Sequence, residues 1–461
     1  MKERLKWLLL LYLLVVNYLK LMKKVLAIIV CKIVRVIGKL VGKGSSLPGK
    51  IALKIDPNIL SEVKLPKYVI AVTGSNGKTS TVEMIKAVLD KSGLSVAYNG
   101  EGSNQIEGVT TFILDNADLK GNVKKDVVLL ESDERYARHT FKHFVPTYYV
   151  ITNLYRDQMT RNGHPEWMFD IIKDSIHDGC KLLLNSDDPL VNAFGDNDDI
   201  YFGIDKYKDS TKENTSVYDD GKYCPKCKNK LVYDYHHYGH IGSYKCTVCD
   251  YKRHEPKYHI TDVNLDEGYL IIDGEYKISL ALKSIYNAYN ILACYSICRE
   301  LNVDPKVIVD TLNNYILKNG RVVEFKVGEN YGTLLTSKHE NSISYDQSLR
   351  VAANYKKDVT AFVMVDAISR KYFTSETSWL WDIDFELLNS PNIKKIVLTG
   401  RYASDVAERF LYAGIDFNKV YLEKDIETAV NYLKNNTIGH IYAITCFSDQ
   451  HKLLNRVEVQ R

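Results

Sequence analysis

The sequence lacks a long apolar run. Near the N-terminus, an uncharged stretch covers residues 7–19 and a second apolar run covers residues 25–31, and neither reaches the roughly 20 residues that a membrane-spanning helix needs. Acidic residues are also scarce there, because residues 1–50 hold eleven Lys and Arg but a single acid, Glu3, a balance of +10 within a total charge of +4. Positive charge confined to one end indicates contact with a membrane surface rather than with nucleic acid.

Lys and Arg recur at helical intervals among Leu, Ile and Val in this N-terminal segment. This pattern predicts helices that lie in the membrane interface with their basic residues facing anionic lipid. Two alternatives stay open. A basic start before a short apolar core is also typical of a signal peptide, although no small-residue cleavage site follows. Residues 25–40 would also fit a helix that caps the core of the folded domain.

The remaining chain has the composition of a globular protein. The whole chain of 461 residues, 45% hydrophobic and 26% charged, has the length of about three domains of ~150 residues, and its composition excludes a disordered chain or a small disulfide scaffold. Four of the nine cysteines form two CxxC pairs, and the others are scattered, mostly in apolar runs. This usage of cysteine suits a reducing cytoplasm.

From residue 67 onward, apolar runs of strand length alternate with segments of helical spacing, which predicts a parallel α/β domain. The expected strands of this first alternation are 68–72, 126–130, 148–152 and 181–184. A polar stretch at 205–257 interrupts it as an inserted module, and helical periodicity returns at 287–301 and 305–317. A second alternation predicts a smaller, Rossmann-like domain, with strands at 361–365, 395–399, 420–422 and 441–445 and helices at 403–413 and 426–434.

The chain is therefore expected to be α/β throughout and to divide into three parts. These are a basic, apolar, membrane-associated segment at 1–50, a central domain at 51–317 with an insert at about 215–258, and a C-terminal Rossmann-like domain at 318–461.

A glycine-rich loop follows the first expected strand and precedes a helix, which is the context that a phosphate-binding loop requires. Glycines allow close approach of the backbone to a phosphate, Lys78 neutralises charge, and Thr79 offers a hydroxyl to Mg²⁺. The loop is shorter than the usual P-loop, and an ordinary strand-to-helix turn is the alternative. The residues predicted to bind nucleotide here are Thr73, Gly74, Ser75, Asn76, Gly77, Lys78, Thr79 and Ser80.

Polar side chains follow two of the expected strands. Glu131, Asp133 and Glu134 come after 126–130, and Asn153 and Asp157 come after 148–152, so all of them are expected at the carboxyl edge of the sheet beside the loop. Carboxylates gathered there would bind Mg²⁺, and Glu131 together with Thr79 is the favoured pair. Acids after strands are also common as helix caps.

The spacing Cys224-x2-Cys227-x18-Cys246-x2-Cys249 predicts a zinc ribbon. Two CxxC pairs can place four thiolates around Zn²⁺, and such a closed site is structural and contributes folding energy to a small insert. Redox pairs or coincidental core cysteines are the alternatives. His236, His237 and His240 lie between the pairs, where an ordinary solvated loop is expected.

Together these motifs resemble the Mur ligase family, whose members use ATP to activate a carboxylate and join it to an amine. The resemblance rests on the loop 73–80, on Thr152-Asn153 followed by Asp157, and on the segment 184–189, Leu-Asn-Ser-Asp-Asp-Pro. The chain is similar in particular to the MurT-like subfamily. The matching features are Leu47-Pro48-Gly49, Glu101-Gly102-Ser103-Asn104, Arg156-Asp157-Gln158-Met159, the two cysteine pairs, and the segments 377–379 and 381–386.

Two segments depart from the subfamily. Its Asn-Pro-Ala-Gly segment is replaced by residues 337–342, Ser-Lys-His-Glu-Asn-Ser, and its Ala-Asp-Gly-Arg-Asp-x-Ser-Trp segment is replaced by residues 372–379. In the second segment, Glu376 stands where the family has the Asp implicated in amide formation. The resemblance implies catalytic roles for Lys78, Glu131 and Glu376 and nucleotide contacts for Asn287, Asn290 and Arg321. Thr399-Gly400-Arg401 resembles the family's C-terminal G-x-R element or is a plain turn.

The resemblance implies an ATP-dependent amidoligase subunit that uses ATP, Mg²⁺ and Zn²⁺. It would activate the α-carboxyl of D-isoglutamate in lipid II as an acyl phosphate, and ammonia from a GatD-like glutaminase partner would convert that group to the amide of D-isoglutamine. Such a subunit would be cytoplasmic, at the inner face of the membrane, and would not bind nucleic acid. A paralogue with another envelope acceptor and a degenerate nucleotide-binding subunit are the alternatives.

Overall fold

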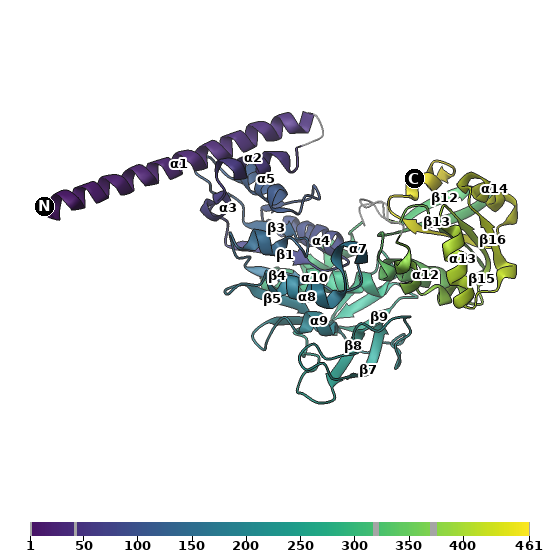
Figure 1. The fold of residues 1–461 in the computed structure, drawn as a ribbon. Helices are drawn as coiled ribbons and strands as arrows, with labels where there is room; N and C mark the ends of the chain where they lie inside the picture. Colours follow the sequence, from purple (N-terminus) through teal and green to yellow (C-terminus); the bar gives the residue numbers. More distant parts are fainter. Residues whose placement is uncertain (1, 41–43, 317–321, 369–375, 461) are drawn as a thin grey trace.

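The computed structural model describes residues 2–40, 44–316, 322–368 and 376–460. Figure 1 shows three parts in chain order: a long N-terminal helix, a central α/β domain that carries a β-hairpin, and a second α/β domain at the C-terminus. The fold is mixed α/β, as the sequence predicts.

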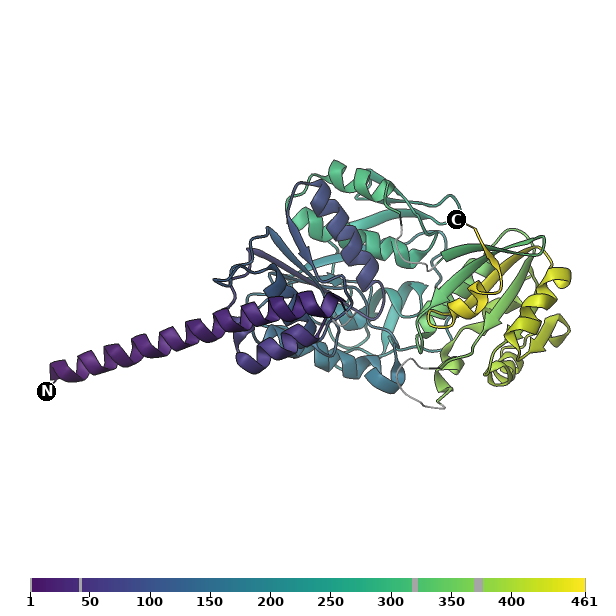
Figure 2. The ribbon, with the colours of Figure 1, turned by 90° about the horizontal axis from the view of Figure 1, so that it is seen from above.

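The N-terminal segment forms one continuous helix, α1 (Lys2–Leu40), where the sequence suggested separate apolar runs. The helix runs through its basic cluster because Leu, Lys, Arg and Ile are compatible with a helix and the first glycine comes at Gly38. Its first half extends beyond the central domain (Figures 1 and 2). Its second half packs on α2 (Leu47–Ile55) and α5 (Ile106–Asn116), which confirms the capping alternative for residues 25–40. Of the helices the structure describes, none has the length and apolar character to cross a membrane.

The central domain is built on a nine-stranded sheet in the order β11-β10-β9-β6-β5-β4-β1-β3-β2. The seven strands from β9 to β2 are parallel, and β10 and β11 add an antiparallel edge. The strands are β1 (Tyr68–Thr73), β2 (Val96–Tyr98), β3 (Val127–Glu131), β4 (Tyr148–Ile151), β5 (Lys181–Asn185), β6 (Ile200–Ile204), β9 (Tyr258–Asn264), β10 (Tyr269–Ile272) and β11 (Tyr276–Ser279). The four strands predicted for this domain agree with β1, β3, β4 and β5 to within one or two residues.

Helices cover both faces of this sheet. Side chains alternate between the two faces along each strand, so the apolar side chains on each face are buried under helices. Ile70 and Val72 of β1 pack with α4, α10 and α11, whereas Val69 and Ala71 pack with α1, α2, α3, α5, α6 and α8. The remaining helices are α3 (Ile59–Glu62), α4 (Lys78–Lys91), α6 (Ala137–Phe141), α7 (Met159–Asn162), α8 (Pro165–Lys173), α9 (Pro189–Asn192), α10 (Ile285–Glu300) and α11 (Pro305–Asn313). Burial on both faces explains why the parallel strands are apolar runs.

The insert leaves the sheet after β6 and returns at β9, and those two strands pair with each other. It contains an antiparallel hairpin of β7 (Leu231–Tyr238) and β8 (Ile241–Cys246). The expectation of a solvated loop for the three histidines is wrong. His236, His237 and His240 are at most 7% exposed. His237 and His240 contact Ile204 and Asp188 of the central domain, and His236 bonds within the hairpin to the Gly239 carbonyl.

The C-terminal domain has a seven-stranded sheet in the order β16-β15-β14-β17-β13-β12-β18. The five strands from β16 to β13 are parallel, and β12 and β18 are antiparallel. The strands are β12 (Val322–Val327), β13 (Asn330–Ser337), β14 (Val359–Met364), β15 (Ile393–Thr399), β16 (Val420–Glu423), β17 (His440–Cys446) and β18 (Glu458–Val459). Four of them, β14 to β17, match the predicted strands.

Helices also lie on both faces of the second sheet. Helices α12 and α13 pack on one face and α14 and α15 on the other. Their bounds are α12 (Ser342–Ala353), α13 (Ala403–Tyr412), α14 (Ile426–Asn436) and α15 (Gln450–Leu454), and the short 3₁₀ turns are Ser378–Asp382, Phe385–Asn389 and Phe417–Lys419. The predicted helices at 403–413 and 426–434 agree with α13 and α14.

Candidate functional site

The glycine-rich loop, residues 73–80, connects β1 to α4 at the carboxyl edge of the central sheet. Gly74 and Gly77 both have positive φ, 132° and 85°. A Cβ at Gly74 would lie 2.2 Å from the hydroxyl oxygen of Thr152, and a Cβ at Gly77 would lie 2.0 Å from the amide oxygen of Asn290. Only glycine fits at either position, so the loop is held close to its neighbours.

The end of β4 braces this loop. The backbone N–H of Ser75 donates to the Asn153 carbonyl at 3.0 Å, and the N–H of Asn76 donates to the Asn153 side-chain oxygen at 2.8 Å. Thr152 and Asn153 both donate to the Asn76 carbonyl at 3.0 Å. These bonds fix the loop and leave the first turn of α4 facing the cleft, where a helix N-terminus binds anions.

Lys78 points back into this loop. Its ammonium donates to the Gly74 carbonyl and to Glu134, and the two side chains are 11% and 7% exposed. Burial opposes charge on Lys78, but the carboxylates of Glu134 and Asp157 outweigh it and raise the pKa of the ammonium. Burial raises the pKa of Glu134, which Lys78 opposes. The pair therefore keeps a buried cation beside the loop.

Glu131 ends β3, and its backbone pairs with Val72 next to the loop. Its carboxylate accepts a hydrogen bond from the Asn104 side chain at 3.4 Å, and its backbone is held by two hydrogen bonds with Asn99. Thr79 lies in the first turn of α4 at the same edge. The structure thus places Glu131, Thr79 and Lys78 at the same edge of the sheet, as the sequence predicts.

The C-terminal domain reaches the same loop through the segment 337–342, one of the two segments that depart from the resemblance described above. The Lys338 ammonium donates to the Ser75 carbonyl at 2.7 Å and to Asp157 at 3.2 Å. The Asn341 and Asn76 amides donate to each other at 3.1 Å, and Asn341 also donates to Asp157 at 2.8 Å. Sequence reasoning missed Lys338 and Asn341, because nothing local links them to a loop about 260 residues away.

Lys338→Met should lower the rate of ATP-dependent turnover at least about tenfold, or about 1.4 kcal/mol, while ATP affinity changes little. Lys338 belongs to the C-terminal domain, so its ammonium contacts the loop, and assists turnover, when the two domains are docked together. Turnover and nucleotide binding should be measured side by side. Lys326→Met is the control, because Lys326 also lies in the C-terminal domain and pairs at its surface with Glu329 at 3.3 Å. Equal turnover in both variants would contradict the role of Lys338.

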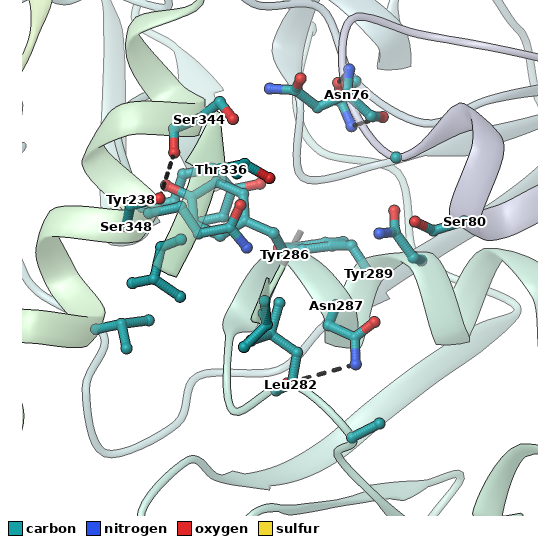
Figure 3. A pocket seen from close by; sticks show the side chains of 18 of the residues that line it. Asn76, Ser80, Tyr238, Leu282, Tyr286, Asn287, Tyr289, Thr336, Ser344 and Ser348 are labelled. Atoms are coloured by element: carbon teal, nitrogen blue, oxygen red, sulfur yellow. Dashed lines mark hydrogen bonds between the residues drawn. The ribbon is translucent and has the colours of Figure 1, made fainter. Parts of the chain in front are cut away.

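A cavity of about 420 Å³ lies beside the loop, between the two domains (Figure 3). Asn76, Gly77 and Ser80 border it from the loop, and Asn287 and Asn290 border it from α10. Aromatic and apolar side chains of both domains complete the walls, among them Tyr238, Leu282, Tyr286, Leu335 and Val351. A mostly apolar wall with a few amides suits a planar base with a sugar. Arg321, the other predicted nucleotide contact, lies outside the described residues.

Arg156 joins the insert to the C-terminal domain. Its guanidinium bonds bidentately to Asp220 of the insert at 2.9 and 2.7 Å, to Asp382 of the C-terminal domain at 2.7 Å, and stacks over Tyr218. Burial opposes ionisation of Asp220, but hydrogen bonds from His164 and Arg156 lower its pKa to about 2. Planar, bidentate pairing makes this a rigid link between the central domain, its insert and the C-terminal domain.

Glu376 stands apart from these groups. It is exposed, and its carboxylate accepts a hydrogen bond from the backbone N–H of Ser378 at 2.8 Å. Hydrogen bonding with the Ser378 hydroxyl, and then with this N–H, lowers the pKa of Glu376. Residues 369–375, which precede it, lie outside the described residues. Gly400 ends β15 with φ 99°, and the backbone N–H of the next residue, Arg401, donates to Asp366 at 2.8 Å. This geometry fits a strand-to-helix turn.

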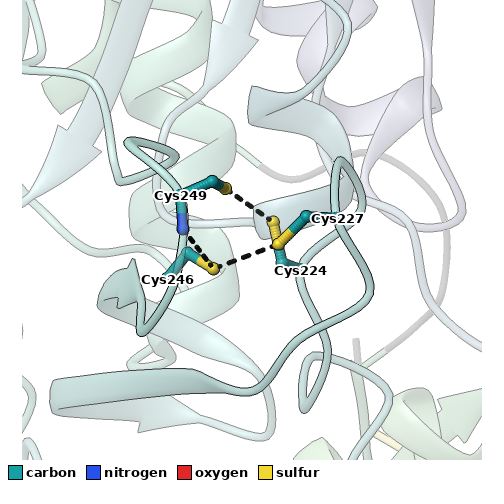
Figure 4. Close-up of side chains that lie close together, drawn as sticks. All are labelled: Cys224, Cys227, Cys246 and Cys249. Atoms are coloured by element: carbon teal, nitrogen blue, oxygen red, sulfur yellow. Dashed lines mark hydrogen bonds between the residues drawn. The ribbon is translucent and has the colours of Figure 1, made fainter.

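The four predicted zinc ligands converge at the end of the insert (Figure 4). Their sulfur atoms all lie within 4.8 Å of one another, with Cys224 and Cys249 at 3.7 Å and Cys227 and Cys246 at 3.4 Å. Backbone N–H groups of Val248 and Cys249 point at the Cys246 sulfur, as they do around thiolates. Two loops that bring four sulfurs together offer a closed, four-coordinate site.

Known families match both domains. The Mur ligase middle domain matches residues 72–236, and the MurT ligase C-terminal domain matches residues 339–449. The chain is 31% identical over 414 residues to the lipid II isoglutaminyl synthase (glutamine-hydrolyzing) subunit MurT of Staphylococcus aureus (strain COL), with 88% of this chain and 92% of the relative covered. It is 30% identical over 415 residues to the subunit of the same name from Streptococcus pneumoniae (strain ATCC BAA-255 / R6), with 88% and 91% covered.

Solved structures share the fold. A pseudomurein peptide ligase type C from Methanothermus fervidus aligns with a TM-score of 0.68 and 22% identity, covering 87% of this chain and 80% of that one. MurF from Acinetobacter baumannii aligns with a TM-score of 0.60 and 15% identity, covering 88% and 80%. At these identities the likeness concerns the arrangement of helices and strands.

Proposed function

Because this chain belongs to the MurT family of Mur ligases, we propose that it is the ATP-dependent synthetase subunit of an enzyme that amidates lipid II. The reaction would convert the α-carboxyl of D-isoglutamate to the amide of D-isoglutamine. One observation carries the proposal: the phosphate loop of the central domain and the segment 337–342 of the C-terminal domain meet beside a cavity of nucleotide size.

The first half of the reaction would use the loop. A carboxylate is a poor electrophile, so the γ-phosphoryl of ATP would pass to it and give an acyl phosphate. Lys78 and the N–H groups at the start of α4 would hold the transferring phosphate, and Asn287 and Asn290 would hold the nucleoside side of ATP. Glu131 and Thr79 would hold Mg²⁺, which when bound neutralises charge on the phosphates. Lys338 would approach from the C-terminal domain and help to orient the loop.

The second half of the reaction needs ammonia, which would displace phosphate from the acyl phosphate. A glutaminase that supplies it from glutamine usually needs a reactive thiolate. Here burial raises the pKa of Cys31, Cys180 and Cys446 to about 12 each, and that of Cys294 well above its ordinary value. These thiols are poor nucleophiles, so we infer a partner like the glutaminase GatD.

We infer that the four-cysteine cluster binds structural Zn²⁺. Zn–S bonds of about 2.3 Å in a tetrahedron separate sulfurs by about 3.8 Å, close to the two distances given above. We also propose the division into a segment 1–50, an ATP-binding domain 51–317 and a Rossmann-like domain 318–461, which the two separate sheets support. A lipid-linked acceptor would place the protein at the inner face of the cell membrane.

The proposal can be tested with the purified chain, co-expressed with the glutaminase of the same source. Lipid II in detergent should gain the mass signature of a carboxyl converted to an amide, and only with ATP and glutamine present. Ammonium chloride should replace glutamine and the partner. Hydrolysis of ATP without an amide product would reject lipid II as the acceptor and favour a paralogue with another envelope acceptor.

Glu376 separates activation from amidation in the same assay. If it has the role of the family's Asp, Glu376→Gln should lower amide formation tenfold or more, about 1.4 kcal/mol, with little change in ATP affinity. Glu376→Asp restores the family residue and should keep activity. The competing explanation is that Glu376 only caps the following 3₁₀ turn, as its exposed position and its hydrogen bond from Ser378 suggest. Full amidation by the Gln variant would support that explanation.

A further inference from the structure

The outer face of α1 carries a continuous line of exposed apolar side chains. They recur at alternating steps of three and four residues, the spacing of one helix face. Each is at least 37% exposed, and in Figure 2 α1 lies above the central domain with no element over it. This set, here called the apolar stripe, consists of Leu19, Met22, Leu26, Ile29, Ile33, Val36 and Leu40.

The opposite face of the same helix is fixed to the enzyme. Ala27, Ile28 and Cys31 are fully buried against α2 and α5. The Lys24 ammonium donates to the Glu62 carbonyl at 2.7 Å, and the Lys32 ammonium donates to the Asp115 carbonyl at 2.8 Å. The helix therefore cannot rotate to bury the stripe without losing its own packing.

Charge around the stripe identifies what covers it. Lys23 and Lys39 are exposed on α1, and residues 4–40 contain no acid. A second copy of the helix would bring like charges together along the contact, which is unfavourable. Anionic phospholipid complements both the lysines and the apolar side chains.

We propose that the apolar stripe is the docking surface for a bilayer containing anionic phospholipid, on which α1 lies in the plane of the interface while its other face holds the catalytic domain. The surface deepens the proposed function, because a lipid-linked acceptor would then be met by an enzyme in one fixed orientation. Helix α5, directly beneath α1, follows the loop that carries Asn104, the partner of Glu131. Helix α5 and the loop before it therefore connect the proposed membrane contact on α1 to the sheet edge that carries Glu131.

Vesicle sedimentation of the full-length protein tests the proposal. The probes are vesicles of phosphatidylcholine alone and of phosphatidylcholine with phosphatidylglycerol. The triple variant Ile29→Glu, Ile33→Glu, Val36→Glu should bind the anionic vesicles at least about tenfold more weakly than wild type. The matched control is Leu411→Glu, Tyr412→Glu, a pair 63% and 73% exposed in the C-terminal domain, which should bind as wild type does.

Two further variants separate charge from apolar contact. Lys23→Gln, Lys39→Gln should weaken binding to anionic vesicles about 25-fold, since each lysine contributes about fivefold, and should not change binding to neutral ones. A chain without residues 1–24 should keep residual binding that the triple variant then removes. Wild-type binding by the triple variant would overturn the proposal, as would equal affinity for neutral and anionic vesicles.

A different occupant would give a different result. If light scattering shows a dimer that the triple variant converts to a monomer while vesicle binding is unchanged, the stripe is an interface between two copies and the proposal fails. Vesicle binding needs neither ATP nor ammonia, so its failure leaves the ligase assignment intact. Failure of the amidation assay in detergent would likewise leave the membrane surface intact.

Discussion

Lys78→Met is expected to lower ATP-dependent turnover by about three orders of magnitude, roughly 4 kcal/mol of transition-state stabilisation. Methionine keeps the apolar stem of the side chain and removes the ammonium. Without it, the γ-phosphoryl would lose the one cation that the central domain supplies from within the loop, in a site where burial strengthens every charge interaction. Turnover should be followed by phosphate release under saturating ATP.

The variant also leaves Glu134 buried without its cation. Its carboxyl pKa, already raised by burial, should then rise further, because Lys78 is the stronger of the two lysines, Lys78 and Lys338, that oppose the rise. The double variant Lys78→Met, Glu134→Gln removes that cost, so it should recover thermal stability without recovering turnover. Lys86→Met is the control on the same helix, where the lysine pairs at the surface with Asp90. Normal turnover in the Lys78 variant would refute the phosphate-loop assignment.

Cys224→Ser is expected to reduce bound zinc from about one ion per chain to a small fraction and to lower the melting temperature by at least about 5 °C. The hairpin has a very small core of its own, formed by Leu231, Tyr244 and Tyr251 with the cysteines, so metal ligation supplies much of its folding energy. Metal analysis and calorimetry measure the two effects independently.

Cys180→Ser provides the matched control for the zinc experiment, because Cys180 lies outside the cluster and is only half-buried. It should change neither zinc content nor melting temperature by a comparable amount. A protein that purifies without metal, and whose stability is the same with and without Cys224, would show that the four thiols are packed side chains instead of ligands.

The sequence predicted the buried strands and the glycine-rich loop, because short runs of neighbouring residues determine both. The strands β1, β3, β4 and β5 are buried on both faces, so their apolar runs are unambiguous, and the loop 73–80 is recognisable from glycine and lysine positions alone. The strands β9 to β11, which lie at one end of the sheet, were not predicted. They mix tyrosine, histidine, threonine and aspartate with apolar residues, because one face or edge is exposed, and their pattern is weak.

The candidate site shows the same limit. Glu131 and Lys78 could be placed at one sheet edge from their positions after a strand and before a helix. The choice of Glu134 as the partner of Lys78 depends on side-chain directions that the sequence does not contain. The contacts of Lys338 and Asn341 depend on how two domains pack, and in the sequence these residues stood out only as a departure from a family pattern.

The amide pair between Asn76 and Asn341 has a thermodynamic consequence. The loop that would hold ATP is the same loop that the C-terminal domain touches, so any effect of ATP on the Asn76–Asn341 contact links nucleotide occupancy to domain association. By reciprocity, any factor by which ATP strengthens the contact between the domains is also the factor by which that contact strengthens ATP binding. If ATP strengthens this contact, a protein that holds the C-terminal domain in its docked position would tighten ATP binding without contacting the nucleotide.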